Sequence, residues 1–229
     1  MNDYGQKDYT LFDIIGPIMI GPSSSHTAGA CRIGYTAQSI VKGDIQSVVF
    51  TLYGSFARTY SGHGTDVALL GGILGFRPDD ERIVDAFEIA KSRGLDYSFK
   101  TDYSDVAHPN TVNVHLVTTS GQVWDILGVS IGGGKMVIQA LNGILIEYTG
   151  SYNTLVTHHR DTPGLLAKIA GILADRQINI ANMRLFREEK GTKAIGIIET
   201  DESIDPSALE ALSVTDGIYY FNVIEKIYD

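Results

Sequence analysis

The sequence predicts an α+β protein made of two differently patterned segments. Its 25 glycines cluster before residue 76 and again at 128–150. From about residue 150 onward, short alternating strands and amphipathic helices replace this pattern, which places a boundary between domains 1–150 and 151–229. A length of 229 residues suits one large or two small domains.

The first segment has the pattern of a mixed α/β domain. Apolar residues at helical spacing give a helix over 25–41 its buried side, and these are Ile33, Ala37, Ile40 and Val41. The pattern that follows predicts a strand at 47–53, helices at 65–74 and 81–92, and strands at 97–101, 112–118 and 122–131. The apolar run 136–148 is expected to be extended.

The second segment has the clearer pattern. A strand at 155–158 precedes a helix that runs to about residue 176, with Asp161 or Thr162 as its cap and Pro163 at its first position. Strands follow at 178–185 and 194–199, then a helix at 206–212 and a strand at 218–227. This βαββαβ order predicts a ferredoxin-like fold, in which two helices cover one face of a four-stranded antiparallel sheet.

Composition excludes several classes of function. With 18 Lys+Arg against 27 Asp+Glu, the net charge is −9, which disfavours binding to nucleic acid or an anionic membrane. A single cysteine, Cys31, rules out an internal disulfide framework, a thiolate zinc site and a self-contained iron–sulfur cluster, so we expect no metal site on this chain. The polar start, residues 1–8, has no apolar signal core, and we expect a cytoplasmic protein.

The densest group of chemically useful side chains is Gly21-Pro22-Ser23-Ser24-Ser25-His26-Thr27-Ala28-Gly29. It stands where a loop enters a helix, so exposed amides and the positive helix end favour an anion such as a substrate carboxylate. His26 titrates near neutral pH and is suited to proton transfer. The simpler alternative is a serine-rich cap beside a surface histidine.

A second group, Gly62-His63-Gly64-Thr65-Asp66, also precedes a predicted helix. Its glycines allow close backbone approach, and Thr65 or Asp66 is expected to cap the helix. The alternative is a plain turn and cap. Both groups place a histidine and hydroxyls at a helix start, and this likeness is the reason to pair them.

The glycine run Gly132-Gly133-Gly134-Lys135 does not form a phosphate-binding loop. Val129 stands where that motif needs a glycine, and Met136 where it needs Ser or Thr. A bulge or a close backbone contact is the better interpretation. Cys31 is expected to be a packing residue, and Trp124 a core or interface residue.

Taken with residues 11–17 and Thr51-Leu52-Tyr53-Gly54-Ser55-Phe56-Ala57, the two groups closely resemble the beta chain of the iron–sulfur-dependent L-serine dehydratases. That family's N-terminal region also resembles an allosteric-substrate-binding domain. Residues 152–228 resemble an ACT domain and are similar to the C-terminal part of D-3-phosphoglycerate dehydrogenases, especially at 178–183. No Gly-x-Gly-x-x-Gly loop is present, which argues against a dehydrogenase.

The resemblance implies an L-serine ammonia-lyase subunit that converts L-serine to pyruvate and ammonia without pyridoxal phosphate. A separate alpha chain would hold the 4Fe-4S cluster, and this chain would be inactive alone. Ser23, Ser24 and Ser25 would contact substrate, and His26 and Thr27 would be catalytic. Whether His26 is the base or an orienting donor stays open, because the partner could supply a lysine. Residues 62–66 would bind substrate or, alternatively, an effector.

The ACT resemblance implies amino-acid binding at a self-associating interface. The matching effector positions are His159, Asp161, Gly164, Leu165 and Asn179. Asp161 replaces an asparagine of the relatives, and a carboxylate would repel the carboxylate of a serine ligand. Two alternatives stand beside this one: an ACT module that only dimerises, and a free-standing amino-acid sensor that is not part of an enzyme.

Overall fold

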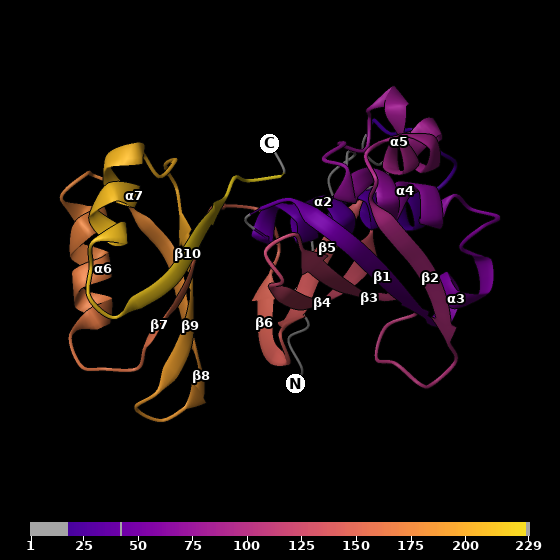
Figure 1. The fold of residues 1–229 in the computed structure, drawn as a ribbon. Coiled ribbons are helices and arrows are strands. Elements are labelled where there is room, and N and C mark those ends of the chain that lie inside the picture. The colour runs from indigo at the N-terminus through magenta and orange to yellow at the C-terminus, as the bar shows by residue number, and fades with distance from the viewer. Residues whose placement is uncertain (1–17, 42, 228–229) are drawn as a thin grey trace, which may run out of the picture.

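The computed structural model describes residues 18–41 and 43–227. Two sheets organise them, a six-stranded one in the order β2-β1-β3-β4-β5-β6 and a four-stranded one in the order β10-β7-β9-β8 (Figure 1). The predicted α+β fold with a ferredoxin-like second domain is confirmed. The run 11–17, which contributes to the resemblance, lies outside the described residues.

The first domain contains a mixed sheet, with one parallel strand pair and four antiparallel pairs. Its elements are η1 (Ser24–Gly29), α2 (Ala30–Ile40), β1 (Ile45–Tyr53), α3 (Gly54–Thr59), α4 (Thr65–Ile73), η2 (Glu81–Asp85), α5 (Ala86–Ser92), β2 (Asp96–Asp102), β3 (Asn110–Thr118), β4 (Val123–Gly132), β5 (Lys135–Leu141) and β6 (Ile144–Tyr148). β1 pairs with β2 in parallel, and the other neighbours are antiparallel.

Helices α2 and α4 cross closely above this sheet. A Cβ on Gly72 would collide with the Cys31 carbonyl oxygen, and one on Gly34 would collide with the Leu69 carbonyl oxygen. Glycine at both positions therefore lets the two helix backbones touch. The apolar sides of both helices are buried with the sheet in one core, as the spacing of Ile33, Ala37 and Ile40 predicts.

Three local features differ from the sequence-based expectation. The helix at 25–41 begins as a wide π-type turn, η1, and the helix at 81–92 begins as the 3₁₀ turn η2. α3 was not expected; it starts at Gly54, whose φ is 55° and whose missing Cβ leaves room for the backbone of Pro109. The run 136–148 is extended as expected, and its two strands form a hairpin that turns through Asn142 and Gly143.

The second domain has the predicted element order. It comprises β7 (Asn153–Arg160), α6 (Leu165–Ala174), β8 (Ile180–Glu189), β9 (Lys193–Thr200), α7 (Pro206–Ser213) and β10 (Ile218–Ile224). All of its strand pairs are antiparallel, and α6 and α7 cover one face (Figure 1). Among residues 18–41 and 43–227, no helix is long and apolar enough to cross a membrane.

The predicted cap of α6 is wrong. Gly164 stands at the cap with a φ of 87°, and Pro163 precedes the helix. Asp161 binds elsewhere, since its carboxylate accepts from Arg187 Nε at 2.8 Å and from the Gly191 amide at 2.9 Å. A positive φ suits glycine, and the Leu165 amide at the start of the helix donates to the Thr162 carbonyl at 3.4 Å in place of a side-chain cap.

The sheet face that the helices leave open packs against the first domain. Val156, Ile195, Ile197 and Ile224 belong to the same apolar cluster as the core of the first domain. Trp124 of β4 is 5% exposed and packs its ring against His158 and Tyr220, as expected for an interface residue.

Hydrogen bonds also join the two domains. Asn222 Nδ2 donates to the carbonyl oxygens of Ser39 at 2.6 Å and Ile40 at 3.0 Å, and the Tyr220 hydroxyl donates to Ile40 at 3.2 Å. The last carbonyls of a helix have no partner within that helix. The second domain therefore satisfies the carboxyl end of α2.

Candidate active site at the start of α2

The polypeptide turn around His26 is held by a single serine cap. Ser23 is extended and its Oγ accepts from the His26 amide at 3.1 Å, while its carbonyl accepts from the amides of Thr27 and Ala28. One serine thus completes the cap. The hydroxyls of Ser24 and Ser25 are not required for capping, so the serine-rich cap alone does not account for the motif.

The half-buried imidazole of His26 lies between two hydroxyl groups. Nδ1 is 3.1 Å from Ser25 Oγ, and Nε2 is 3.0 Å from Ser55 Oγ. A neutral imidazole donates at one nitrogen and accepts at the other, and a hydroxyl can do either, so both tautomers fit. Burial, followed by the nearby His63, lowers the pKa of His26 below 6.5. The neutral ring is the form favoured at neutral pH.

The second predicted group reaches the same place through His63. The His63 ring meets the His26 ring edge to face at a centroid distance of 5.1 Å. Thr27 Oγ1 donates to the His63 carbonyl at 3.2 Å, which ties the loop to the start of α2. The likeness between the two groups in the sequence is therefore matched by contact between them in space.

The predicted capping by Thr65 or Asp66 is wrong. Gly64, at φ 67°, is the cap residue of α4 and makes no side-chain cap bond. Thr65 is fully buried, and Asp66 Oδ1 accepts from the neighbouring Val67 amide at 2.9 Å. Burial raises the pKa of Asp66. Gly62 and His63 are exposed, so this loop presents its histidine outward and its threonine inward.

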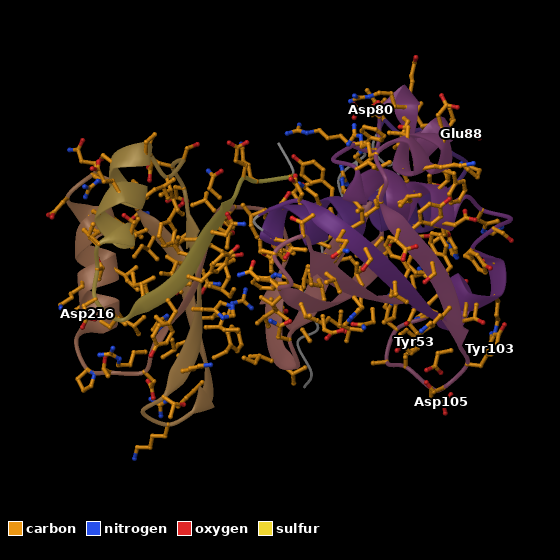
Figure 2. All side chains as sticks on the ribbon, in the orientation of Figure 1. Tyr53, Asp80, Glu88, Tyr103, Asp105 and Asp216 are labelled. Atoms are coloured by element: carbon orange, nitrogen blue, oxygen red, sulfur yellow. The ribbon has the colours of Figure 1, made fainter. Side chains whose placement is uncertain are left out.

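Sequence reasoning missed Ser55 and Ser130. Ser55 is the second residue of α3, directly after β1, and its amide donates to the Pro109 carbonyl at 2.6 Å. The loop that contains Tyr103 and Asp105 lies at this end of β1, near Tyr53 (Figure 2). Ser130 Oγ donates to the Ser25 carbonyl at 2.8 Å and supports the turn from behind. The signal for Ser55 was its place in the run 51–57 that contributes to the resemblance.

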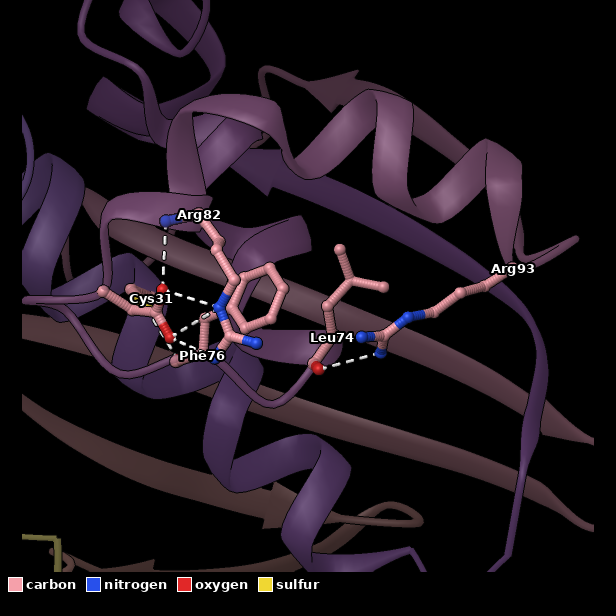
Figure 3. Close-up of polar contacts among 6 residues, drawn as sticks. Cys31, Leu74, Phe76, Arg82 and Arg93 are labelled. Atoms are coloured by element: carbon pink, nitrogen blue, oxygen red, sulfur yellow. Dashed lines mark hydrogen bonds and ion pairs between the residues drawn. The ribbon is translucent and has the colours of Figure 1, made fainter.

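This chain's residues do not fit an iron–sulfur cluster. Cys31 is fully buried, and its thiol donates to the Phe76 carbonyl at 3.3 Å. The Arg82 guanidinium lies over the ring of the same Phe76 (Figure 3). Burial raises the pKa of this thiol to about 12, which disfavours the thiolate that iron requires. Cys31 is a packing residue, as expected. In the described part of the chain, no three His, Cys, Asp or Glu side chains group as a metal site.

The predicted effector residues of the second domain occupy both ends of α6. At one end, His159 is 2% exposed with Nδ1 3.0 Å from Thr157 Oγ1, Asp161 pairs with Arg187, and Gly164 and the buried Leu165 begin the helix. Burial lowers the pKa of His159, and the Gly191 amide foremost lowers that of Asp161.

Asn179 follows the other end of α6. Its Nδ2 donates to Asp201 Oδ2 at 2.7 Å, and its amide donates to Glu202 Oε2 at 2.7 Å. Because α6 separates it from Asp161 and Gly164, one copy of the chain does not bring the whole predicted group together.

Two relatives match this chain over nearly its whole length. A beta chain of L-serine dehydratase from Peptoniphilus asaccharolyticus is 44% identical over 222 residues, which cover 96% of this chain and 98% of that one. A probable L-serine dehydratase beta chain from Bacillus subtilis is 44% identical over 212 residues, covering 93% and 96%. This chain belongs to the family of L-serine dehydratase beta chains.

Family models agree with this assignment. Residues 10–94 match the serine dehydratase beta chain family, and residues 153–216 match the ACT domain. The match to the beta chain family includes both histidine-containing groups. D-3-phosphoglycerate dehydrogenase of Bacillus subtilis is 28% identical over 197 residues, 86% of this chain but only 37% of that enzyme. The resemblance inferred from the sequence is thus confirmed.

Proposed function

We propose that this cytoplasmic chain acts within an L-serine dehydratase that converts L-serine to pyruvate and ammonia. A separate alpha chain holds a 4Fe-4S cluster, pyridoxal phosphate takes no part, and this chain alone is inactive. The observation that supports the proposal best is His26, held between Ser25 and Ser55 at the start of α2, in a chain with two full-length relatives of that name. Residues 1–150 provide the site and residues 151–229 regulate it.

The elimination needs a base for the α-proton and a Lewis acid or proton donor for the leaving hydroxyl. A cluster held by the alpha chain would supply the Lewis acid. This chain contributes His26, which its lowered pKa keeps neutral and able to accept a proton. Whether His26 takes the α-proton itself or orients a partner lysine is decided by the experiment below.

Substrate binding is assigned to the polar groups around that imidazole. The hydroxyls of Ser23, Ser24 and Ser25 lie in the turn that opens α2, where the positive end of the helix favours a carboxylate. Thr27 acts by holding the His63 carbonyl. The loop formed by Gly62, His63, Gly64, Thr65 and Asp66 contacts the His26 ring through His63. Its exposed part, Gly62 and His63, would face L-serine and the alpha chain.

The ACT domain is assigned to regulation through self-association. β8 is an edge strand of its sheet, so it can pair with β8 of a second copy. Such pairing would bring Asn179 of one copy toward His159, Asp161, Gly164 and Leu165 of the other. An amino acid with its ammonium on Asp161 would then bridge the two copies.

Anaerobic reconstitution tests the proposal. Pyruvate release from L-serine is measured for this chain alone, for the cluster-bearing alpha chain alone and for the mixture. Turnover only in the mixture, lost on exposure to oxygen, is the expected result. If the mixture is inactive while this chain alone binds an amino acid by calorimetry, the chain is a free-standing sensor instead.

Within the active mixture, His26→Ala separates the two roles of the imidazole. A fall in kcat/KM by a factor of about 100 or more supports direct proton transfer by His26. A fall of less than about threefold, under roughly 0.7 kcal/mol, excludes it. Ser92→Ala, an exposed hydroxyl on α5, is the matched control and should leave turnover unchanged.

A further inference from the structure

A cavity of about 340 Å³ opens on the ACT domain at the ends of β7, β9 and β10. It is lined by His158, His159, Lys193, Ala194, Tyr219 and Tyr220. Only His159 is shared with the predicted effector group. The volume is typical of a small-molecule site. None of the proposed steps above uses this cavity.

The cavity lies beside the aromatic cluster that joins the two domains. Tyr220 and His158 are register partners on β10 and β7, and their rings meet at 90° with centroids 6.0 Å apart. Trp124 of the first domain packs against both, at 5.8 Å from His158 and 5.6 Å from Tyr220. A molecule in the cavity would therefore touch side chains that already contact Trp124.

The chemistry of the lining favours an organic anion. Lys193 contributes an ammonium and Tyr219 a phenol group, and no lining residue is acidic. The Tyr220 hydroxyl already donates to Ile40, so Tyr220 offers its ring. Tyr219, 55% exposed, also offers a ring on which a flat group can pack.

The same residues lead to the start of the candidate active site. The Tyr220 hydroxyl donates to the Ile40 carbonyl at 3.2 Å, at the carboxyl end of α2. The other end of that helix continues from η1, which contains Ser25 and His26. A ligand that displaces Tyr220 would change a bond on the helix that positions His26.

We infer that this cavity binds a small carboxylate with a flat apolar body, and that Tyr220 transmits its binding to α2. Lys193 pairs with the carboxylate and the tyrosine rings hold the flat body. Arg160 is not among the lining residues and pairs with Asp216 at 3.7 Å (Figure 2 labels Asp216), so Lys193 is the lysine or arginine that the lining supplies. The transmission step rests on the proposed function, whereas the binding step does not.

The binding step can be measured on the full chain without its partner. Trp124 is the single tryptophan, so its fluorescence reports on its contacts with His158 and Tyr220. Benzoate is the probe, and benzylamine is the same ring with the opposite charge. We expect a saturable fluorescence change with benzoate and none with benzylamine.

Two variants locate the binding. Lys193→Gln should weaken benzoate binding about tenfold or more, because it removes a charge-assisted contact. Lys168→Gln, an exposed lysine on α6, should bind as the wild type does. The inference is overturned if calorimetry detects no benzoate binding up to about 10 mM, if benzylamine binds equally, or if Lys193→Gln has wild-type affinity.

The transmission step is tested in the complex with the alpha chain. Benzoate should alter serine turnover, and Tyr220→Phe, which keeps the ring, should bind benzoate but lose that response. If Tyr220→Phe responds as the wild type does, the route through Ile40 is wrong. If benzoate binds and Lys193→Gln abolishes it while the complex turns over no serine, the site stands and the proposed function fails.

Discussion

The hydroxyl of Ser55 offers the sharpest test of the site geometry. It lies 3.0 Å from Nε2 of His26, and Ser25 Oγ lies 3.1 Å from Nδ1 on the other side of the ring. Ser55→Ala removes one of these two constraints. The backbone contacts of Ser55 survive the change, since its amide still donates to Pro109 and its carbonyl still accepts from Thr59.

The expected loss follows from that single hydrogen bond. A neutral hydrogen bond contributes about 0.5–1.5 kcal/mol, which corresponds to a factor of about 2–13 in rate if it acts fully in the transition state. Because Ser55 orients the imidazole and does not hold the substrate carboxylate, we expect the loss in kcat, with KM nearly unchanged.

The assay is anaerobic pyruvate release by the complex with the alpha chain, with thermal unfolding of the same variant as a fold control. The reasoning is refuted if kcat stays at the wild-type value while the fold is intact. It is equally refuted if the loss is entirely in KM, because Ser55 would then bind substrate and not orient His26. Ser92→Ala should change neither parameter, since that hydroxyl bonds only to its own helix.

Three further predictions follow from burial and packing. Burial and His63 lower the pKa of His26, and proton acceptance needs the neutral imidazole, so turnover should fall as pH drops through that lowered pKa. The same shift makes this group's contribution to stability fall as pH drops from about 6.5 toward the folded-state pKa. A pH series of turnover and of thermal unfolding checks both. Cys31, fully buried with a pKa of about 12, should resist a thiol reagent at pH 8 until the chain unfolds, and rapid labelling of the folded chain would contradict its placement. Gly72→Ala should destabilise the fold by about 2–4 kcal/mol, because its Cβ would collide with the backbone of α2. Gly171→Ala on α6, where a Cβ meets nothing within 4 Å, should be neutral or stabilising by up to about 1 kcal/mol. Equal unfolding midpoints for the two variants would show that α2 and α4 can separate.

Periodicity was sufficient to predict the elements that bury one face. The second domain was readable because α6 and α7 repeat with an apolar side and turn residues separate its strands, although β7 and β9 are buried on both faces. Every predicted element exists. α3 has six residues, too few for a helical repeat to appear. The cap of α6 was misjudged because a positive φ at Gly164 depends on backbone conformation, which the polar residues before it did not indicate.

The site itself was predicted only where it is local in sequence. Ser23, Ser25, His26 and Thr27 are adjacent, and a cap motif with excess hydroxyls was visible without a structure. Ser55 is 29 positions from His26 and reaches it only because α3 starts where β1 ends, beside the loop that precedes β3. Such a contact depends on strand register, for which the sequence pattern gives no distance.

Helix α2 connects the two halves of the proposed function because it is bonded at both ends. Its start continues from the turn that holds His26, and its last carbonyls accept from Tyr220 and Asn222 of the ACT domain. A helix of 11 residues is about 16 Å long and bends little, since each turn is hydrogen-bonded to the next. Gly34 and Gly72 fix its crossing with α4, so sideways movement is blocked by backbone contact. A shift of the ACT sheet must therefore either break the bonds to Ile40 or tilt α2 about that crossing, and the second outcome moves His26 relative to Ser55.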